Sequence, residues 1–218
     1  MIKRDKGIRI PSNLVVMGTV NMDETTCSFP RKVLDRAMTF ELNDVSDMYD
    51  IQSIDGEGAR AYGSIAAPEV HQSMLSARDA CDWDKQTAQK VLAYIKTVND
   101  VLERSPFKIA YRSRNEILIY CLERIKDGKA ELPQALDEVT SMKILARIEG
   151  DDQKLALVNQ DDAETDDKTV LDRLENVIPE ARKAANDGNE PTVPCNVCRE
   201  KIIFMKNRLK GGFTNFFV

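Results

Sequence analysis

The chain has 218 residues, of which 42% are hydrophobic and 31% are charged, and its formal net charge is −5. This length accommodates one large domain or two small ones. The negative charge argues against a surface coated in basic residues for nucleic acid, although it leaves room for a local basic patch.

The apolar runs and the cysteines indicate the compartment. No apolar run approaches the roughly 20 residues that cross a bilayer, and no apolar segment follows the first six residues, so we expect no membrane span and no signal peptide. The five cysteines are odd in number, and three of them are scattered along the chain (Cys27, Cys81 and Cys121). That usage fits a reducing environment, so the predicted localisation is cytoplasmic.

The first elements predict an α/β pattern. Residues 13–20 form a continuous, β-branched apolar run, which is typical of a buried strand in a parallel sheet covered on both faces. Residues 30–37 predict a short helix with proline in its first turn. Residues 38–42 alternate in polarity like a second strand. Strand, helix and strand together indicate an α/β domain.

From about residue 86 the pattern becomes helical. Three apolar stripes have helical spacing: Val91, Ile95, Val98 and Leu102; Leu118, Cys121, Leu122 and Ile125; and Leu136, Val139, Met142 and Leu145. Gly128 and Gly150 stand where the second and third helices would end. A further helix at roughly 168–186 is expected to kink or break at Pro179.

Charge is unevenly distributed in the last third of the chain. Residues 149–167 contain eight acids and one lysine, which predicts a solvated loop. The tail from Arg199 to Lys210 carries five bases and one acid.

Two residues are candidates for chemistry on a phosphate. Asn21 follows the first predicted strand, at the sheet edge where α/β proteins bind ligands. Its carboxamide could orient a water, or it could simply be a turn residue. Arg36 ends the short helix, where a guanidinium could stabilise charge in phosphoryl transfer on a neighbouring subunit. Its alternative roles are a pair with Asp35 or an interaction with the helix C-terminus.

Three other motifs carry less weight. Asp23 and Glu24 follow an apolar run that Asn21 interrupts, so we interpret them as a turn or helix start. Cys195 and Cys198 have the spacing of half a zinc site, and two thiolates leave half of a tetrahedral site empty, so we predict no metal. The sequence contains no Gly-x-x-x-x-Gly-Lys-Ser/Thr phosphate-binding loop.

Together, four segments resemble one family. The stretch NLVVMGTVNMDETTCSFPRKVLDRA at 13–37 resembles the sensor-1 region of McrB-like AAA+ nucleotide-driven motors, in which a strand ends in Gly-Thr-x-Asn-x-Asp-Glu-Thr-Thr and a helix ends in Val-Leu-Asp-Arg-Ala. AYRSRNEILIY at 110–120, ILARIEG at 144–150 and RLKGGFTNFF at 208–217 are similar to parts of that family's lid. The chain departs from the pattern at Cys27, where the family often has histidine, and at Pro30-Arg31, where it often has Ser-Pro.

The resemblance implies a role for each candidate residue. Asn21 would be the sensor-1 asparagine that positions the lytic water. Arg36 would be the arginine finger that acts on a neighbour's nucleotide. Arg112 or Arg114 would be the sensor-2-like arginine that contacts the phosphates from the lid.

The implied fold is mixed α/β, predominantly helical. It consists of the C-terminal fragment of an AAA+ α/β core at 1–50, a connector at 51–85, and an α-helical lid domain at 86–218 with an acidic insertion at 149–167. The incomplete core leads us to expect residues 13–42 to be labile in the isolated chain, and the helices to be stable.

The implied activity belongs to a complete motor. Its cofactors would be ATP or GTP with Mg²⁺, and the choice of nucleotide stays open. Its partners would be an upstream motor half that carries the phosphate-binding loop, further copies in a ring homo-oligomer, a nuclease subunit and, indirectly, DNA, in restriction or phage defence. The isolated chain is expected not to hydrolyse nucleotide. The alternative is a non-catalytic protein- or DNA-binding module derived from the same fold.

Overall fold

The computed structural model describes residues 16–20, 29–41, 75–103, 105–156, 169–178 and 197–217. These residues are 63% helical, and the β-pairing found outside named strands among them consists of two isolated bridges, Gly150 with Thr214 and Ala156 with Thr169. The predominantly helical class is therefore confirmed for the described part of the chain.

The chain divides into two compact units. The first comprises Met1–Asn21 and Glu41–Leu75, and the second comprises Met22–Phe40 and Ser76–Val218. Most described residues belong to the second unit, which is called the helical unit below.

The predicted strand at 13–20 is wrong where the structure describes it. Residues 16–20 adopt no regular structure, and Val16 and Met17 are 85% and 86% exposed. A strand is buried only when neighbours pair with its backbone and cover its faces, and no described residue does this for 16–20. Residues 38–41 are likewise irregular, so the second predicted strand is not found in that range.

The short helix predicted at 30–37 is present as α1, Arg31–Leu34, with Pro30 at its N-terminal cap position. Its backbone bonds continue to Ala37, whose N–H donates to the carbonyl of Val33 at 3.0 Å. A helix of four residues is too short to be stable alone. Its position must therefore come from packing.

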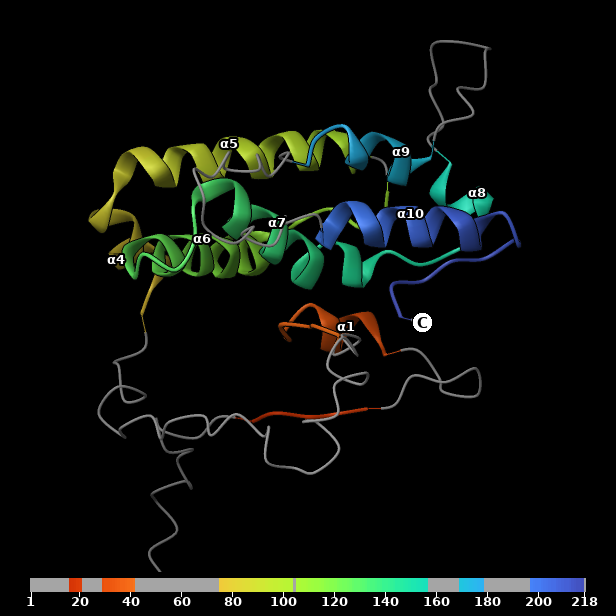
Figure 1. Cartoon of the computed structure of the whole chain (residues 1–218), viewed down its shortest axis with the longest axis horizontal. Coiled ribbons are helices and arrows are strands. Elements are labelled where there is room, and N and C mark those ends of the chain that lie inside the picture. Colours follow the sequence, from red (N-terminus) through yellow and green to blue (C-terminus); the bar gives the residue numbers. More distant parts are fainter. Residues whose placement is uncertain are drawn as a thin grey trace, which may run out of the picture. The chain divides into compact units, whose positions relative to one another are not determined.

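Two capped helices open the bundle (Figure 1). α4, Ala77–Trp83, begins with a capping box between Ser76 and Asp79, so the helical region starts earlier than residue 86. α5, Lys85–Val101, begins where the Asp84 side chain accepts from the Thr87 N–H. Such caps stabilise a helix by about 1 kcal/mol each.

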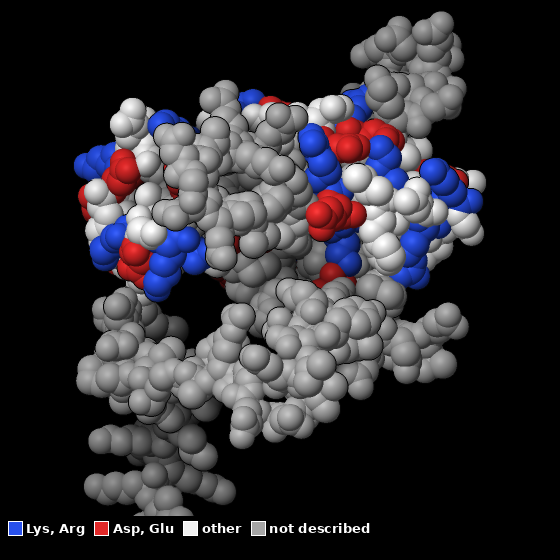
Figure 2. Space-filling model, in the orientation of Figure 1, with Lys and Arg blue, Asp and Glu red and all other residues white. Residues whose placement is uncertain are grey.

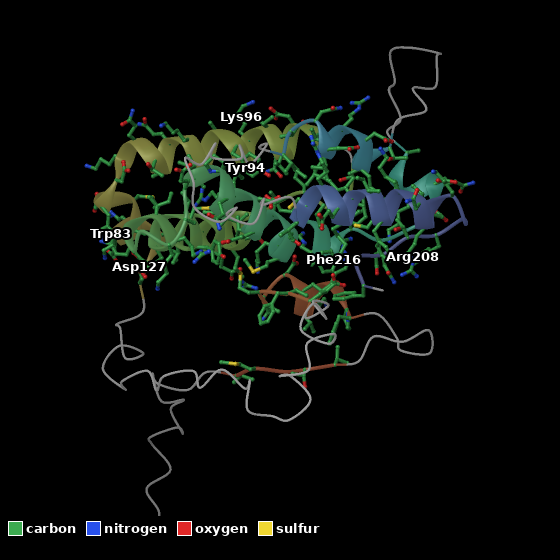
Figure 3. The ribbon with its side chains drawn as sticks, in the orientation of Figure 1. Trp83, Tyr94, Lys96, Asp127, Arg208 and Phe216 are labelled. Atoms are coloured by element: carbon green, nitrogen blue, oxygen red, sulfur yellow. The ribbon has the colours of Figure 1, made fainter. Side chains whose placement is uncertain are left out.

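The predicted stripe of α5 is confirmed, since Val91, Ile95, Val98 and Leu102 are all buried. Figure 3 shows Tyr94 pointing from α5 into the bundle and Lys96 pointing away from it. The Tyr94 hydroxyl lies 2.6 Å from Thr140 Oγ1 on α7. Burial raises the pKa of Tyr94 well above its ordinary value, so this hydroxyl stays protonated.

The next two helices follow most of the predicted stripes, with Ile125 and Met142 only half-buried. α6, Tyr111–Lys126, buries Leu118, Cys121 and Leu122, and Gly128 beyond it has a φ of 65°, the left-handed conformation that glycine adopts at a helix end. α7, Leu132–Lys143, buries Leu136 and Val139 and leads into the short 3₁₀ helix η2, Leu145–Arg147.

The acidic segment is only partly a loop. Residues Asp152–Leu155 form the short helix α8, capped by Asp151, and Leu155 is fully buried. The remainder of the predicted loop, 157–167, lies outside the described residues. α9, Val170–Glu175, opens with a capping box between Thr169 and Asp172, and Pro179 of the predicted kink also lies outside the described part.

The last helix, α10, Val197–Leu209, packs on α7 and α9, while α6 packs on α4, α5 and α7. The N-terminus of α10 is anchored by a carboxylate from α7. Asp137 accepts hydrogen bonds from the Val197 and Cys198 backbone N–H groups at 3.0 and 3.2 Å. The chain then turns back, and Thr214 pairs with Gly150 through two 2.9 Å backbone bonds.

Candidate functional site

Three of the four candidate residues predicted from the sequence lie at the end or the start of a described helix. Asn21 lies outside the described residues. Arg36 follows the C-cap residue Asp35 of α1, and its side chain is exposed. Exposure is what a residue acting on another subunit requires, but it is also common for surface arginines.

Arg112 and Arg114 lie in the first turn of α6. The N-cap residue Ala110 supplies no side-chain hydrogen bond, so the amides of the first turn have no side-chain cap from that residue. A helix N-terminus favours anions because its N–H groups point outward. Arg112 is exposed, whereas Arg114 is half-buried.

Arg114 is held by its neighbours. Its Nε and one terminal nitrogen donate to Asn115 Oδ1 at 3.1 and 2.8 Å. Its guanidinium lies 5.1 Å from the ring centre of Tyr111, a side chain that is 78% exposed. The start of α6 is therefore a basic, aromatic surface suited to a phosphate or another anion.

A buried lysine joins α1 to the bundle. Lys143 at the end of α7 has no exposed surface. Its Nζ lies 2.5 Å from Glu116 Oε2 on α6 and donates to the carbonyls of Ala37 and Asp35 at 2.8 and 3.3 Å. Lys143 therefore combines an ion pair with Glu116 and two hydrogen bonds to backbone carbonyls.

A buried arginine holds the same end of α1. Arg147 Nε lies 2.8 Å from Asp35 Oδ1, and a terminal nitrogen donates to the Lys108 carbonyl at 3.4 Å. Burial lowers the pKa of the Arg147 guanidinium, and the charge of Asp35 opposes that shift. A guanidinium stays protonated in proteins, so the pair is ionic.

The other end of α1 is attached by Arg31. Its guanidinium donates to the Pro106 carbonyl and lies 5.0 Å from the ring centre of Phe107, which is itself buried. Thr39 adds a backbone bond of 3.4 Å to the Met142 carbonyl. The short helix is therefore fastened to the bundle at both ends.

The sequence does not single out Lys143, Glu116 or Arg147 as buried charges. Lys143 and Asp35 are separated by 108 positions, so no local pattern reports their pairing. The one available signal is the spacing of Lys143 and Arg147, which are four residues apart beside an apolar stripe.

A second polar cluster braces α6 against α7. Glu138 accepts two bonds from Arg124, at 2.7 and 3.0 Å, and one from the Tyr120 hydroxyl at 2.7 Å. Burial alone would raise the pKa of the Glu138 carboxyl, but the bonds from Arg124 and Tyr120 outweigh burial and hold that pKa below its ordinary value.

The cysteine pair is only half described. Cys198 is buried, and its thiol donates to the Asp137 carbonyl at 2.9 Å, whereas Cys195 lies outside the described residues. Within the ranges given above, no group of three or more histidine, cysteine or acidic side chains is arranged to hold a metal ion. The absence of a metal at this pair stays a prediction.

Segments far apart in the sequence meet in the helical unit. Arg147 and Gly150 belong to 144–150, and they contact Asp35 of 31–37 and Thr214 of 208–217. Lys143, immediately before that segment, pairs with Glu116 of 110–120. The parts of the chain that resemble the lid of a nucleotide-driven motor therefore form one connected structure with α1.

The described residues thus form a helical domain in which two buried basic side chains, Lys143 and Arg147, fasten a short basic helix. A family model described as Domain of unknown function (DUF8727) matches residues 64–212, and the chain belongs to this family. No curated protein and no solved structure matches the chain. No helix in the described ranges has the length and apolarity needed to span a membrane.

Proposed function

We propose that this chain is the C-terminal portion of an McrB-like AAA+ nucleotide-hydrolysing motor, active in DNA restriction or phage defence. The observation that supports the proposal is the convergence just described. Four segments that resemble motor landmarks are spread over 187 positions of sequence, from 31 to 217. Residues 144–150 contact 31–37 and 208–217 directly, and 110–120 is joined to 31–37 through Lys143, which pairs with Glu116 and donates to the Ala37 carbonyl.

In this proposal Arg36 is the arginine finger. It is exposed at the end of a helix that is fixed at both ends, so its guanidinium can be presented to a nucleotide on the next subunit. There it would stabilise the negative charge that develops on the transferred phosphoryl group. Asn21 would orient the attacking water in the same reaction.

Arg112 and Arg114 would contact phosphates from the lid. The start of α6 fits such a ligand, because two arginines flank first-turn amides that lack a side-chain cap. ATP or GTP with Mg²⁺ would supply the phosphoryl group. The loop that grips the phosphates and the acids that hold magnesium are assigned to the upstream motor half.

The test is a reconstituted motor that contains this chain and an upstream half with a Gly-Lys-Ser/Thr loop. Arg36→Ala is expected to lower nucleotide hydrolysis by about 10³–10⁵-fold, the value of an arginine finger, and to leave nucleotide binding largely intact. Lys32→Ala is the matched control, since Lys32 is an exposed base on the same helix.

Mixing the Arg36→Ala protein with a phosphate-loop variant should restore part of the activity, because intact sites form at mixed interfaces. No rescue at any ratio would contradict action between subunits. A motor that neither binds nor hydrolyses ATP or GTP would overturn the proposal and favour a non-catalytic binding module.

A further inference from the structure

The backbone on both sides of Arg36 is held by one side chain. The carbonyl before Arg36, that of Asp35, and the carbonyl after it, that of Ala37, both accept from Lys143 Nζ, at 3.3 and 2.8 Å. The carboxylate of Asp35 is held in turn by Arg147 at 2.8 Å. The residues that flank Arg36 thus make three polar contacts with the end of α7 and with η2.

These contacts decide where Arg36 lies. α1 has only four helical residues and cannot hold a fixed orientation by itself. Lys143 and Arg147 are almost completely buried, at 0% and 6% exposure, so water competes little for their donors. Arg36 itself stays exposed, and it is therefore oriented by its neighbours rather than by its own contacts.

We infer that Lys143 and Arg147 are positioning residues for Arg36, and that they make the proposed arginine finger move as one body with the helical lid. The inference rests on the proposed function for the role of Arg36. A lid that shifts when nucleotide binds at its own site would carry Arg36 with it, and so would link that site to the neighbour on which Arg36 acts.

The first arm of the test uses the isolated chain and needs no nucleotide. Asp35→Asn removes the charge pair with Arg147, and it is a mild change because the Asp35 side chain is 42% exposed. Lys143→Met removes the bonds to both flanking carbonyls. Both variants should speed hydrogen exchange of the amides of residues 35–37 by at least about tenfold. The amides of α5 and α6 should change little.

Lys96→Met is the matched control, since Lys96 is exposed on α5 and pairs with Asp100 on the same helix. If Lys143→Met fails to fold, the exchange measured for Asp35→Asn alone tests the inference. Unchanged exchange at 35–37 in the folded variants would overturn the inference. So would an equal loss of protection in α1 and α6.

The second arm uses the reconstituted motor. Asp35→Asn is expected to lower kcat by about tenfold or more with little change in KM, because the nucleotide is bound elsewhere. Because the effect acts through Arg36, the double variant Asp35→Asn/Arg36→Ala should be no slower than Arg36→Ala alone. A further decrease in the double variant would contradict a positioning role.

The two ideas can fail separately. If Arg36→Ala leaves hydrolysis unchanged, the proposed function of Arg36 fails even where exchange shows that Lys143 and Arg147 hold α1. Suppose instead that Arg36→Ala abolishes hydrolysis, but hydrogen exchange at 35–37 and kcat are unchanged in Asp35→Asn and Lys143→Met. The proposed function then survives and the positioning inference is lost.

Discussion

Glu138 accepts hydrogen bonds from three different side chains. Its carboxylate accepts bonds from Arg124, Tyr120 and Gln134, and its side chain is only 19% exposed. Contacts of this kind favour the ionised carboxylate, and they explain why the pKa of Glu138 is below its ordinary value in spite of burial.

The depressed pKa of Glu138 sets the direction of a pH effect. Its contribution to stability is complete above the unfolded pKa and is lost as the pH falls through the lower folded pKa. Glu138→Gln should lower the free energy of unfolding by about 1–3 kcal/mol at pH 7. The gap between the two proteins should close as the pH falls toward 3, as measured by urea unfolding at several pH values.

Glu103→Gln is the control for this series, since the Glu103 side chain is 61% exposed and pairs with a similarly exposed Lys108. It should change the free energy of unfolding by less than about 0.5 kcal/mol. A gap for Glu138→Gln that is the same at pH 3 and pH 7 would show that charge on Glu138 contributes nothing.

At the scale of the element, α10 depends on a residue of another helix. Asp137→Ala removes the acceptor for the Val197 and Cys198 amides, and it leaves the N–H group of the buried Cys198 unsatisfied. We expect a loss of about 1–3 kcal/mol in the free energy of unfolding, with a smaller loss for Asp137→Asn, which keeps one acceptor oxygen.

Asp127→Ala is the matched control for α10. Asp127 is exposed and pairs with Lys129 within its own turn, so its loss should stay within about 0.5 kcal/mol. Equal losses for Asp127→Ala and Asp137→Ala in urea unfolding would mean that the contact with α10 adds no stability.

Helices were predictable from the sequence because their signal is local. Val91, Ile95 and Val98 repeat at helical spacing, and a helix satisfies its backbone within the same segment. A strand depends on other segments for its backbone hydrogen bonds and for the side chains that bury its faces. The apolar run that includes Val16 and Met17 therefore predicted burial, whereas both residues are exposed in the structure.

The candidate site also has a part that could be predicted from the sequence and a part that could not. The sequence placed Arg36 at the end of a short helix, and the structure agrees, whereas the sequence assigned Arg112 and Arg114 no position within a helix and the structure places them in the first turn of α6. The contacts of Lys143 and Arg147 with α1 could not be predicted, because ion pairs between distant residues leave no periodic pattern. The roles of the three arginines stay predictions.

At the scale of the molecule, the surface of the helical unit is mixed in charge. Figure 2 shows acidic side chains among the basic ones over much of the described surface in this view. The charges of the described residues are therefore not separated into one acidic and one basic face in this view. Association with other subunits would depend on local pairs rather than on a large uniform field.

The sequence predicts that residues 13–42 are uniformly labile, but we expect their amides to differ in hydrogen-exchange rate. The exposed, irregular residues 16–20 should exchange at close to the unfolded rate in the isolated chain. The amides of Asp35 and Ala37 should exchange far more slowly, because they bond to Arg31 and Val33 carbonyls within a helix fastened to the bundle.

In the same experiment, amides of α5 and α6 should be the slowest, because these helices bury the apolar stripes. Fast exchange at 35–37 as well as 16–20 would restore the expectation of a uniformly labile N-terminal segment. Strong protection of 16–20 in a monomer would show that this segment has found cover of its own.

The antiparallel bridge between Ala156 and Thr169 has a consequence for engineering. It places Ala156 and Thr169 side by side, so the distance between these two residues is set by their own pairing. Doubling the length of a flexible connection adds only about 0.6 kcal/mol of closure entropy. Many domains have neighbouring termini, so an epitope or a small reporter domain could be grafted between Ala156 and Thr169 while the helical packing around Leu155 and Val170 is kept.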